Sequence, residues 1–327
     1  MFDPALNVAL QRLQSPAVTL FFQFATALAY APVLIAFLSM LYWTWDKRRV
    51  FGLIQLFLYS SLIENMLKEV FHTLRPFQVD PEHVQLLDYF MRREIADSGT
   101  QWAIPARTSF SFPSGHAQMA ICFYGAMALH LRRREATIGA AVLIVAIALS
   151  RLYLGCHFLG DVLGGLLAGG VILSLYAMIV RLDGRRNRFP SRQLMHFLAF
   201  AAPIGLFLFW PDSSSAMRAA FLLGFAGGFF AERRWVHFST DGPPKRRIAR
   251  FAIGLTILVG AYFVLNRVLH YAAENNLFAE PIFFTIVCYG AIGLVVSLGV
   301  PGLLSLLGLA TESGGTTEAK ANNVGEK

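Results

Sequence analysis

The chain has 327 residues, of which 56% are hydrophobic and 15% are charged, and its mean hydropathy is +0.53. This composition excludes a soluble globular protein, because too few polar side chains are present to cover its surface. The net charge of +8 does not indicate nucleic-acid binding, since the basic residues lie in short connectors between apolar runs and are not interleaved with exposed aromatic residues.

Unbroken apolar runs of about 20 residues match the length of a bilayer-spanning helix and not the shorter alternating segments of a membrane β-barrel. They predict an all-α fold, a polytopic membrane helical bundle. The runs begin near Ala17, Phe51, Ser114, Thr137, Phe158, Gln193, Ala219, Phe251 and Ile282. Residues 1–16 are expected to form a short extracytoplasmic segment, and the polar residues 311–327 a disordered cytoplasmic tail.

The charges of the connectors predict the orientation, because Lys and Arg are retained on the cytoplasmic side of short loops. Alternate connectors are strongly basic, with Lys47, Arg48, Arg49, Arg132, Arg133, Arg134, Arg185, Arg186, Arg188, Arg192, Arg233, Arg234, Lys245, Arg246 and Arg247. The connectors between them are poor in Lys and Arg. We therefore expect an external N-terminus and an internal C-terminus. Short connectors and the lack of a eukaryotic targeting signal favour a bacterial inner membrane.

The long outer connector, residues 77–112, contains Asp80-Pro81, a typical helix start, followed by Val84, Leu87 and Phe90 at helical spacing. This pattern predicts a short amphipathic helix lying on the bilayer surface. An ordinary solvated loop is the alternative.

Three polar islands interrupt the apolar chain, and the predicted topology places all of them at the outer face. They are Lys68 with Arg75-Pro76, then Pro113-Ser114-Gly115-His116, then Ser150-Arg151 with His157 and Asp161. Cleavage of a phosphate ester needs this inventory: cations to hold the anion, an imidazole to attack, another to release the leaving group, and a carboxylate to orient the attacker.

Spacing supports this interpretation. His157 and Asp161 are four residues apart and share one face of a helix, so the carboxylate can orient the imidazole, although a purely structural His–Asp hydrogen bond is the alternative for this pair taken alone. Ser114 and Gly115 precede a span, where free backbone N–H groups suit an oxyanion, and His116 is placed to protonate a leaving group.

The three cations of the islands, Lys68, Arg75 and Arg151, each resemble snorkelling residues at a membrane edge. Their convergence with two histidines instead indicates a bound polyanion such as phosphate. The islands contain no carboxylate cluster for Mg²⁺ and no three-ligand set for Zn²⁺, so we expect neither a metal nor a cofactor.

Together the islands form a three-part signature that resembles the type 2 phosphatidic acid phosphatase superfamily of membrane lipid phosphatases. The resemblance implies a six-helix catalytic core, here residues 17–211, while residues 212–310 form about three additional transmembrane helices. It also implies a phosphohistidine mechanism with His157 as nucleophile, Asp161 as its orienter and His116 as the acid. The resemblance assigns the phosphoryl oxygens to Lys68, Arg75, Ser114, Gly115 and Arg151.

The expected function is therefore a metal-independent phosphatase that acts on a lipid phosphate or diphosphate at the extracytoplasmic face. Its expected partners are membrane lipids and a lipid phosphate or prenyl diphosphate substrate, with no nucleic acid. Two alternatives stay open: a lipid phosphotransferase of the same family, and a phospholipid-binding or transport protein without catalysis.

Overall fold

The computed structural model describes residues 2–96, 110–186, 196–209, 211, 213–275 and 281–310. Within these ranges the regular structure is entirely helical, which confirms the predicted fold class. The first half comprises α1 (Ala5–Gln11), α2 (Pro16–Ala27), α3 (Ala31–Thr44), α4 (Lys47–Phe71), α5 (Pro76–Val79), α6 (Tyr89–Ala96), α7 (Gly115–Leu131), α8 (Arg134–Tyr153) and α9 (Leu159–Arg186). The second half comprises η1 (Phe197–Ala201), α11 (Ala202–Phe209), α12 (Ser213–Ala231), η2 (Glu232–Val236), α13 (Pro244–Glu274), α14 (Pro281–Leu294), η3 (Val295–Gly299) and α15 (Val300–Leu306).

Several of these helices are long and apolar enough to cross a membrane. Within the described residues there are five such spans, and a sixth if α2 and α3, bent by 52° at their junction, count as one. The five are Lys47–Val79, Arg134–Tyr153, Leu159–Val180, Pro244–Leu265 and Ile282–Leu306. The sequence predicted nine spans. The other three apolar runs are helical but are not among these spans: α7 has 17 residues, Phe197–Phe209 is shorter still, and the third run forms α12.

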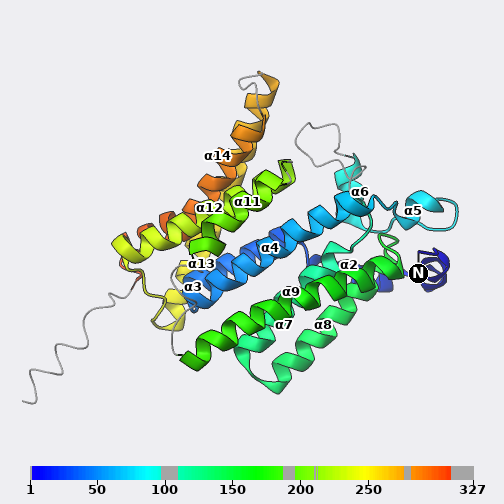
Figure 1. Cartoon of the computed structure of the whole chain (residues 1–327), viewed down its shortest axis with the longest axis horizontal. Coiled ribbons are helices and arrows are strands. Elements are labelled where there is room, and N and C mark those ends of the chain that lie inside the picture. Colours follow the sequence, from blue (N-terminus) through cyan, green and yellow to red (C-terminus); the bar gives the residue numbers. More distant parts are fainter. Residues whose placement is uncertain are drawn as a thin grey trace, which may run out of the picture.

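Helix α4 forms the axis of the molecule (Figure 1). It packs against α7 and α9 on one side and against α12 on the other. It therefore joins two groups of helices, one that contains α7, α8 and α9 and one that contains α12 and α14. The carboxylate of Asp46 caps its start by accepting from the backbone N–H groups of Arg48 at 3.0 Å and Arg49 at 3.3 Å. Its end is marked by His72 in the left-handed conformation. The helix thus connects the two ends of the bundle, with Lys47 at one end and Lys68 at the other.

Glycines allow close helix contacts in both groups. A Cβ at Gly165 of α9 would collide with the carbonyl oxygen of Ser114, and a Cβ at Gly224 of α12 would collide with that of Gly290 in α14. These two glycines therefore serve helix packing. The first contact presses the start of α9 against the start of α7, which matters for the site described below.

The expected helix start at Asp80-Pro81 is wrong. Asp80 ends α5 instead, because Pro76 has already started that short helix. The next helix is α6, where the Asp88 carboxylate accepts from the Met91 N–H at 3.0 Å. Leu87 is buried, and its N–H donates to the Leu154 carbonyl at 3.0 Å. This part of the connector therefore packs onto the α8–α9 junction, and its position on the bilayer stays a prediction.

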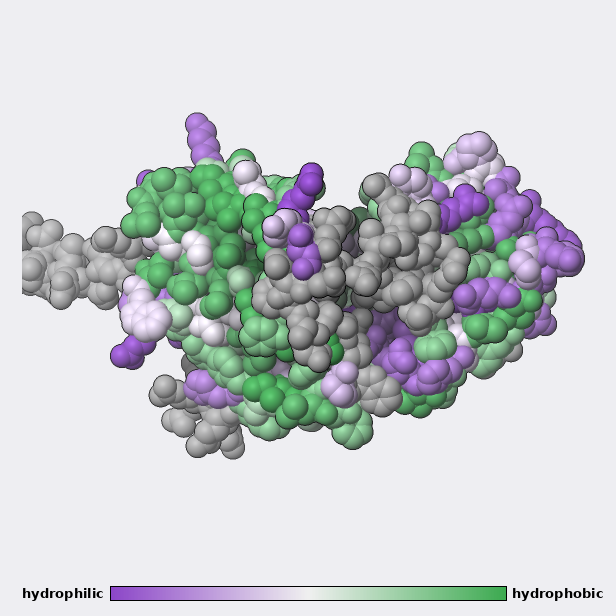
Figure 2. Space-filling view, turned by 90° about the horizontal axis from the view of Figure 1, so that it is seen from above, coloured by the Kyte–Doolittle hydropathy of each residue, from purple (hydrophilic) through white to green (hydrophobic). Residues whose placement is uncertain are grey.

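Hydrophobic side chains cover much of the surface, and hydrophilic ones gather towards the end that carries α5 and the N-terminus (Figure 2). Leu167 of α9, for example, is 72% exposed, as expected for a side chain that faces lipid. The protein is an integral membrane protein. The division at residues 16, 211 and 310 stays a prediction, and the expected tail, 311–327, lies outside the described residues.

Candidate active site

Backbone hydrogen bonds join the three polar islands at one end of the bundle. The Ser111 N–H donates to the Thr73 carbonyl at 2.8 Å, which ties the segment before α7 to the segment after α4. The Ser114 N–H donates to the Asp161 carbonyl at 2.9 Å, which ties the start of α7 to the start of α9. Backbone N–H and carbonyl groups thus bring the three islands together, although they are distant in the sequence.

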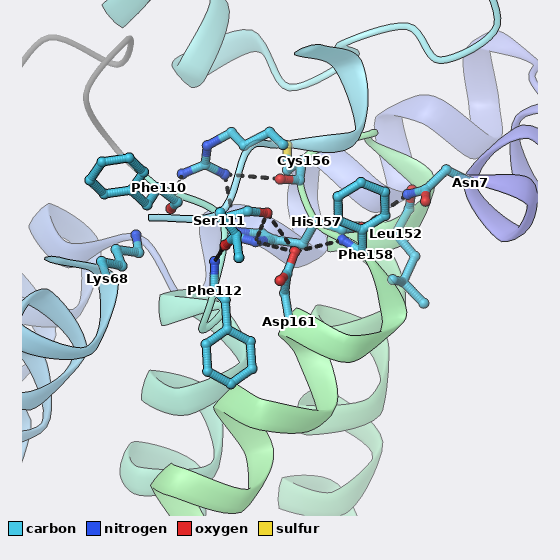
Figure 3. A network of polar contacts seen from close by, with 12 residues as sticks. Asn7, Lys68, Phe110, Ser111, Phe112, Leu152, Cys156, His157, Phe158 and Asp161 are labelled. Carbon is cyan, nitrogen blue, oxygen red and sulfur yellow. Dashed lines mark hydrogen bonds and ion pairs between the residues drawn. The ribbon is translucent and has the colours of Figure 1, made fainter. Parts of the chain in front are cut away.

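His157 lies at the centre of this arrangement and is 2% exposed (Figure 3). Its Nδ1 is 3.6 Å from Oδ2 of Asp161. The same carboxylate oxygen accepts from the Phe158 N–H at 2.8 Å and from the Ser111 hydroxyl. Asp161 therefore caps α9 while facing the imidazole, and these bonds fix its position.

Arg75 contacts the other side of the imidazole. Its Nη1 lies 3.2 Å from Nε2 of His157 and 2.9 Å from the Cys156 carbonyl oxygen. A guanidinium can only donate, so Nε2 accepts and the hydrogen of the neutral ring is on Nδ1, towards Asp161. Burial, and next the charges of Arg75 and Arg151, lower the pKa of His157 well below its ordinary value. The free protein therefore holds a neutral imidazole with its Nε2 lone pair among cations.

Arg151 is fully buried and forms an ion pair with Asp88, with 2.6 Å between Nη1 and Oδ2. The same Nη1 donates to the Thr26 hydroxyl. Burial alone would raise the pKa of Asp88, but Arg151 and the Met91 amide outweigh it and hold that pKa below its usual value. Asp88 was not predicted from the sequence as a site residue. A buried arginine requires an acidic partner, which was the available signal.

Some buried polar atoms of the site have no hydrogen-bond partner within the part of the chain that the structure describes. They are Oγ of Ser114, Nε2 of His116, Nε and Nη2 of Arg151, and Oδ1 of Asp161. Unpartnered buried polar groups are costly and are concentrated at functional sites. His116 is one of the groups whose charge acts on His157, and its ring centroid is 5.8 Å from that of Tyr30. These atoms can donate to, or accept from, a molecule bound beside His157.

Lys68 completes the set. Its Nζ is 2.6 Å from Oε1 of Glu64, and a Cβ at Gly115 would lie 2.5 Å from that same oxygen. Gly115 therefore leaves room for the Glu64–Lys68 pair at the start of α7. Lys68 also acts electrostatically on His157. The structure thus brings all eight predicted residues to one end of the bundle: Lys68, Arg75, Ser114, Gly115, His116, Arg151, His157 and Asp161.

Helix α1, whose role was not predicted from the sequence, supports the backbone of the segment that carries His157. The buried Asn7 amide donates to the carbonyls of Leu152 at 2.8 Å and His157 at 3.0 Å. One turn later, the Gln11 amide donates to the Tyr153 carbonyl at 2.9 Å. Asn7 and Gln11 share one helix face, and this spacing was the signal available in the sequence.

Two family models match the chain. The model described as "PAP2 superfamily" matches residues 49–185, and "PAP2 superfamily phosphatase, transmembrane extension" matches residues 216–312.

The chain is also similar to individual proteins. It is 31% identical to phosphatidylglycerophosphatase B of Bacillus subtilis (strain 168) over 160 residues, which is 46% of this chain and 64% of the relative. It is 24% identical to lipid phosphate phosphatase delta of Arabidopsis thaliana over 185 residues, which is 53% of this chain and 41% of the relative. The chain therefore spans less than two thirds of either relative. A crystal structure of a transmembrane PAP2-type phosphatidylglycerolphosphate phosphatase from Bacillus subtilis is similar at 25% identity, covering 55% of this chain and 84% of that chain, with a TM-score of 0.43.

Proposed function

Because the chain belongs to the PAP2 superfamily, as its three-part signature predicted and two family models confirm, we propose that it is a lipid phosphate phosphatase. It hydrolyses a phosphomonoester or a diphosphate through a phosphohistidine intermediate. The observation that carries this proposal is the position of His157, with Nδ1 facing Asp161 at 3.6 Å and Nε2 facing Arg75 at 3.2 Å.

In the first step, Nε2 of His157 attacks the phosphorus. The P–N bond forms as the P–O bond to the leaving group breaks. Burial and Arg151 lower the pKa of His116 in the free protein, so His116 takes up its proton beside the anionic substrate and gives it to the leaving oxygen. Asp161, whose Oδ2 faces Nδ1 at 3.6 Å, stabilises the positive charge that develops on the ring. Arg75 and Arg151 stabilise the phosphoryl oxygens, for which Arg151 offers a buried Nη2 that has no partner among the described residues.

In the second step, water hydrolyses the phosphohistidine. His116, now neutral, accepts a proton from the water as its oxygen attacks the phosphorus, and the P–N bond breaks. Inorganic phosphate is released, His157 is again neutral, and His116 again carries its proton. The same two rings thus complete a cycle that consumes one water per phosphate released.

We propose a metal-independent reaction because cationic side chains take the place that a metal ion would have. Lys68, Arg75 and Arg151 supply the positive charge that stabilises the transferring phosphoryl group. The acidic side chains nearby have partners: Asp88 pairs with Arg151, Glu64 pairs with Lys68, and Oδ2 of Asp161 accepts from Ser111. Such a donor set suits an anion better than a divalent cation.

The substrate class and the orientation follow from the membrane setting. The connector charges support an active site at the extracytoplasmic face of a bacterial inner membrane. A lipid phosphate enters such a site from the bilayer, and the candidates are prenyl diphosphates, phosphatidate and phosphatidylglycerophosphate. The names of the two curated relatives support a lipid phosphate as substrate.

Phosphate release from a panel of these lipids by the purified full-length chain tests the proposal. The wild type should release inorganic phosphate in the presence of EDTA and without an added acceptor lipid, whereas His157→Ala should release none. His83→Ala, at an exposed histidine, is the matched control. Release that requires an acceptor would indicate the phosphotransferase instead, and lipid binding without release from any substrate would indicate a non-catalytic protein.

A further inference from the structure

A polar cavity lies at the end of α4 opposite the candidate active site. Lys47 and Lys68 are 21 positions apart, which separates the two ends by roughly 30 Å of helix. The cavity has a volume of about 540 Å³ and lies between the α3–α4 junction and the segment that joins η2 to α13. Its lining includes Trp45, Arg48, Arg233, His237, Phe238 and Arg247.

Two fully buried charged residues hold the walls of this cavity. The Glu232 carboxylate accepts from Nζ of Lys47 at 2.8 Å and from the Phe238 N–H at 2.6 Å. Arg250 donates to the carbonyls of Thr240 and Asp241, each at 2.6 Å. Because buried charges are stable only when well paired, these contacts fix the 238–241 segment against the start of α4. The cavity is therefore a built feature of the fold.

The lining is predominantly cationic. Within the described ranges, Arg233 and Arg247 form no ion pair. Burial, and next the positive charge of Arg48, lower the pKa of Arg233 below its ordinary value, so these two cations lie close together. The acidic residues of the lining are Asp46, which pairs with Arg49 at 3.1 Å, and Asp241. Converging cations of this kind suit an anion with several oxygens.

The position of the cavity favours a lipid over a soluble anion. Two membrane spans, Lys47–Val79 and Pro244–Leu265, begin beside it. Trp45 lines the cavity, and Trp235 nearby in the chain is 71% exposed. Tryptophan and arginine at the ends of spans mark the level of the lipid headgroups.

We propose that this cavity binds the phosphate of an anionic phospholipid headgroup, with Arg233 and Arg247 as the principal contacts. The acyl chains of that lipid extend into the adjoining bilayer. This site is distinct from the candidate active site and does not depend on the proposed phosphatase activity. The predicted topology places it in the cytoplasmic leaflet.

Native mass spectrometry of the full-length chain in detergent tests the proposal, with dioctanoyl phosphatidylglycerol, dioctanoyl phosphatidylcholine and inorganic phosphate as three separate probes. Arg233→Gln/Arg247→Gln should weaken phosphatidylglycerol binding about tenfold or more, because each basic residue contributes to attraction of an anionic lipid. The matched control is Lys245→Gln/Arg246→Gln, which removes the same charge from exposed residues outside the lining. It should bind nearly as well as the wild type.

A second variant keeps the test decisive if the double arginine variant does not fold. Ser239→Phe fills the cavity without changing the charge and should also abolish the preference for phosphatidylglycerol. Three results would overturn the proposal: equal weakening in the two double variants, binding of phosphatidylcholine as tight as that of phosphatidylglycerol, or inorganic phosphate competing as well as the lipid. The last result would identify a soluble anion as the ligand.

Discussion

Oδ2 of Asp88 lies 2.6 Å from Nη1 of Arg151, and both side chains are almost completely shielded from solvent. The pair joins the long connector after α5 to the end of α8. It balances one of the cations that the proposed mechanism uses for phosphate binding, while leaving the Nε and Nη2 groups of Arg151 without a partner in the described residues. The connector is thus part of the candidate active site.

Removal of Asp88 should be strongly destabilising. Asp88→Ala leaves Arg151 buried without its carboxylate, and breaking a buried ion pair in this way costs about 3 to 5 kcal/mol. Thermal unfolding in detergent should show a large fall in midpoint relative to the wild type. Glu82→Ala, at an exposed carboxylate in the same connector, should change the midpoint little. Similar midpoints for the two variants would contradict the importance of this pair.

The pH dependence of the reaction should reflect the lowered pKa of His157. Because burial and Arg75 favour the neutral ring, protonation of His157 requires a pH below its ordinary pKa of about 6.5. After correction for ionisation of the substrate, the acidic limb of kcat/KM that reports protonation of His157 should therefore lie below pH 6.5. Arg75→Gln removes one positive charge and should move the acidic limb upwards. An acidic limb centred at 6.5 or above in the wild type would contradict this assignment.

Ser111 should affect turnover by orienting Asp161. Its hydroxyl donates to Oδ2 of Asp161 and lies 3.4 Å from Nδ1 of His157. Ser111→Ala should lower kcat about tenfold to a hundredfold, the usual range for a hydrogen bond to a charged group. Ser111→Thr retains the hydroxyl and should restore most of the rate. Equal rates for the alanine and threonine variants would show that the hydroxyl does not contribute.

Asn7 should act as a positioning residue for the nucleophile segment. Asn7→Ala removes two hydrogen bonds, to the carbonyls of Leu152 and His157, and lets the segment shift relative to the cations. We expect kcat to fall about tenfold with little change in KM, because small errors in orientation act on the chemical step. Gln14→Ala, at an exposed position just after α1, is the control. A rise in KM alone would indicate a role in substrate binding instead.

Local patterns in the sequence were sufficient where neighbouring residues determine the structure. The apolar runs predicted the helices, and the four-residue spacing of His157 and Asp161 predicted their contact. Arg75-Pro76 illustrates the limit: its proline begins α5, so the later helix signal at Asp80-Pro81 falls at the end of that helix. No local rule separates two such competing signals.

The convergence of the three polar islands was predicted, but individual contacts between distant segments could not be. Asp88 and Arg151 are 63 positions apart, and their pairing depends on how the connector folds back over α8. The contact between Glu64 and Gly115 depends likewise on the packing of α4 against α7. These contacts depend on tertiary structure, which periodicity and capping rules do not describe.

The hydrogen bonds from Asn7 and Gln11 have a consequence for protein engineering. Helix α1 precedes the region matched by the first family model, residues 49–185, yet it holds the backbone on which His157 is carried. A chimera or truncated version that begins at residue 49 would retain every motif residue but would lose the hydrogen bonds from Asn7 and Gln11. The smallest autonomous catalytic unit is therefore larger than its signature, and transplants should include the first helix.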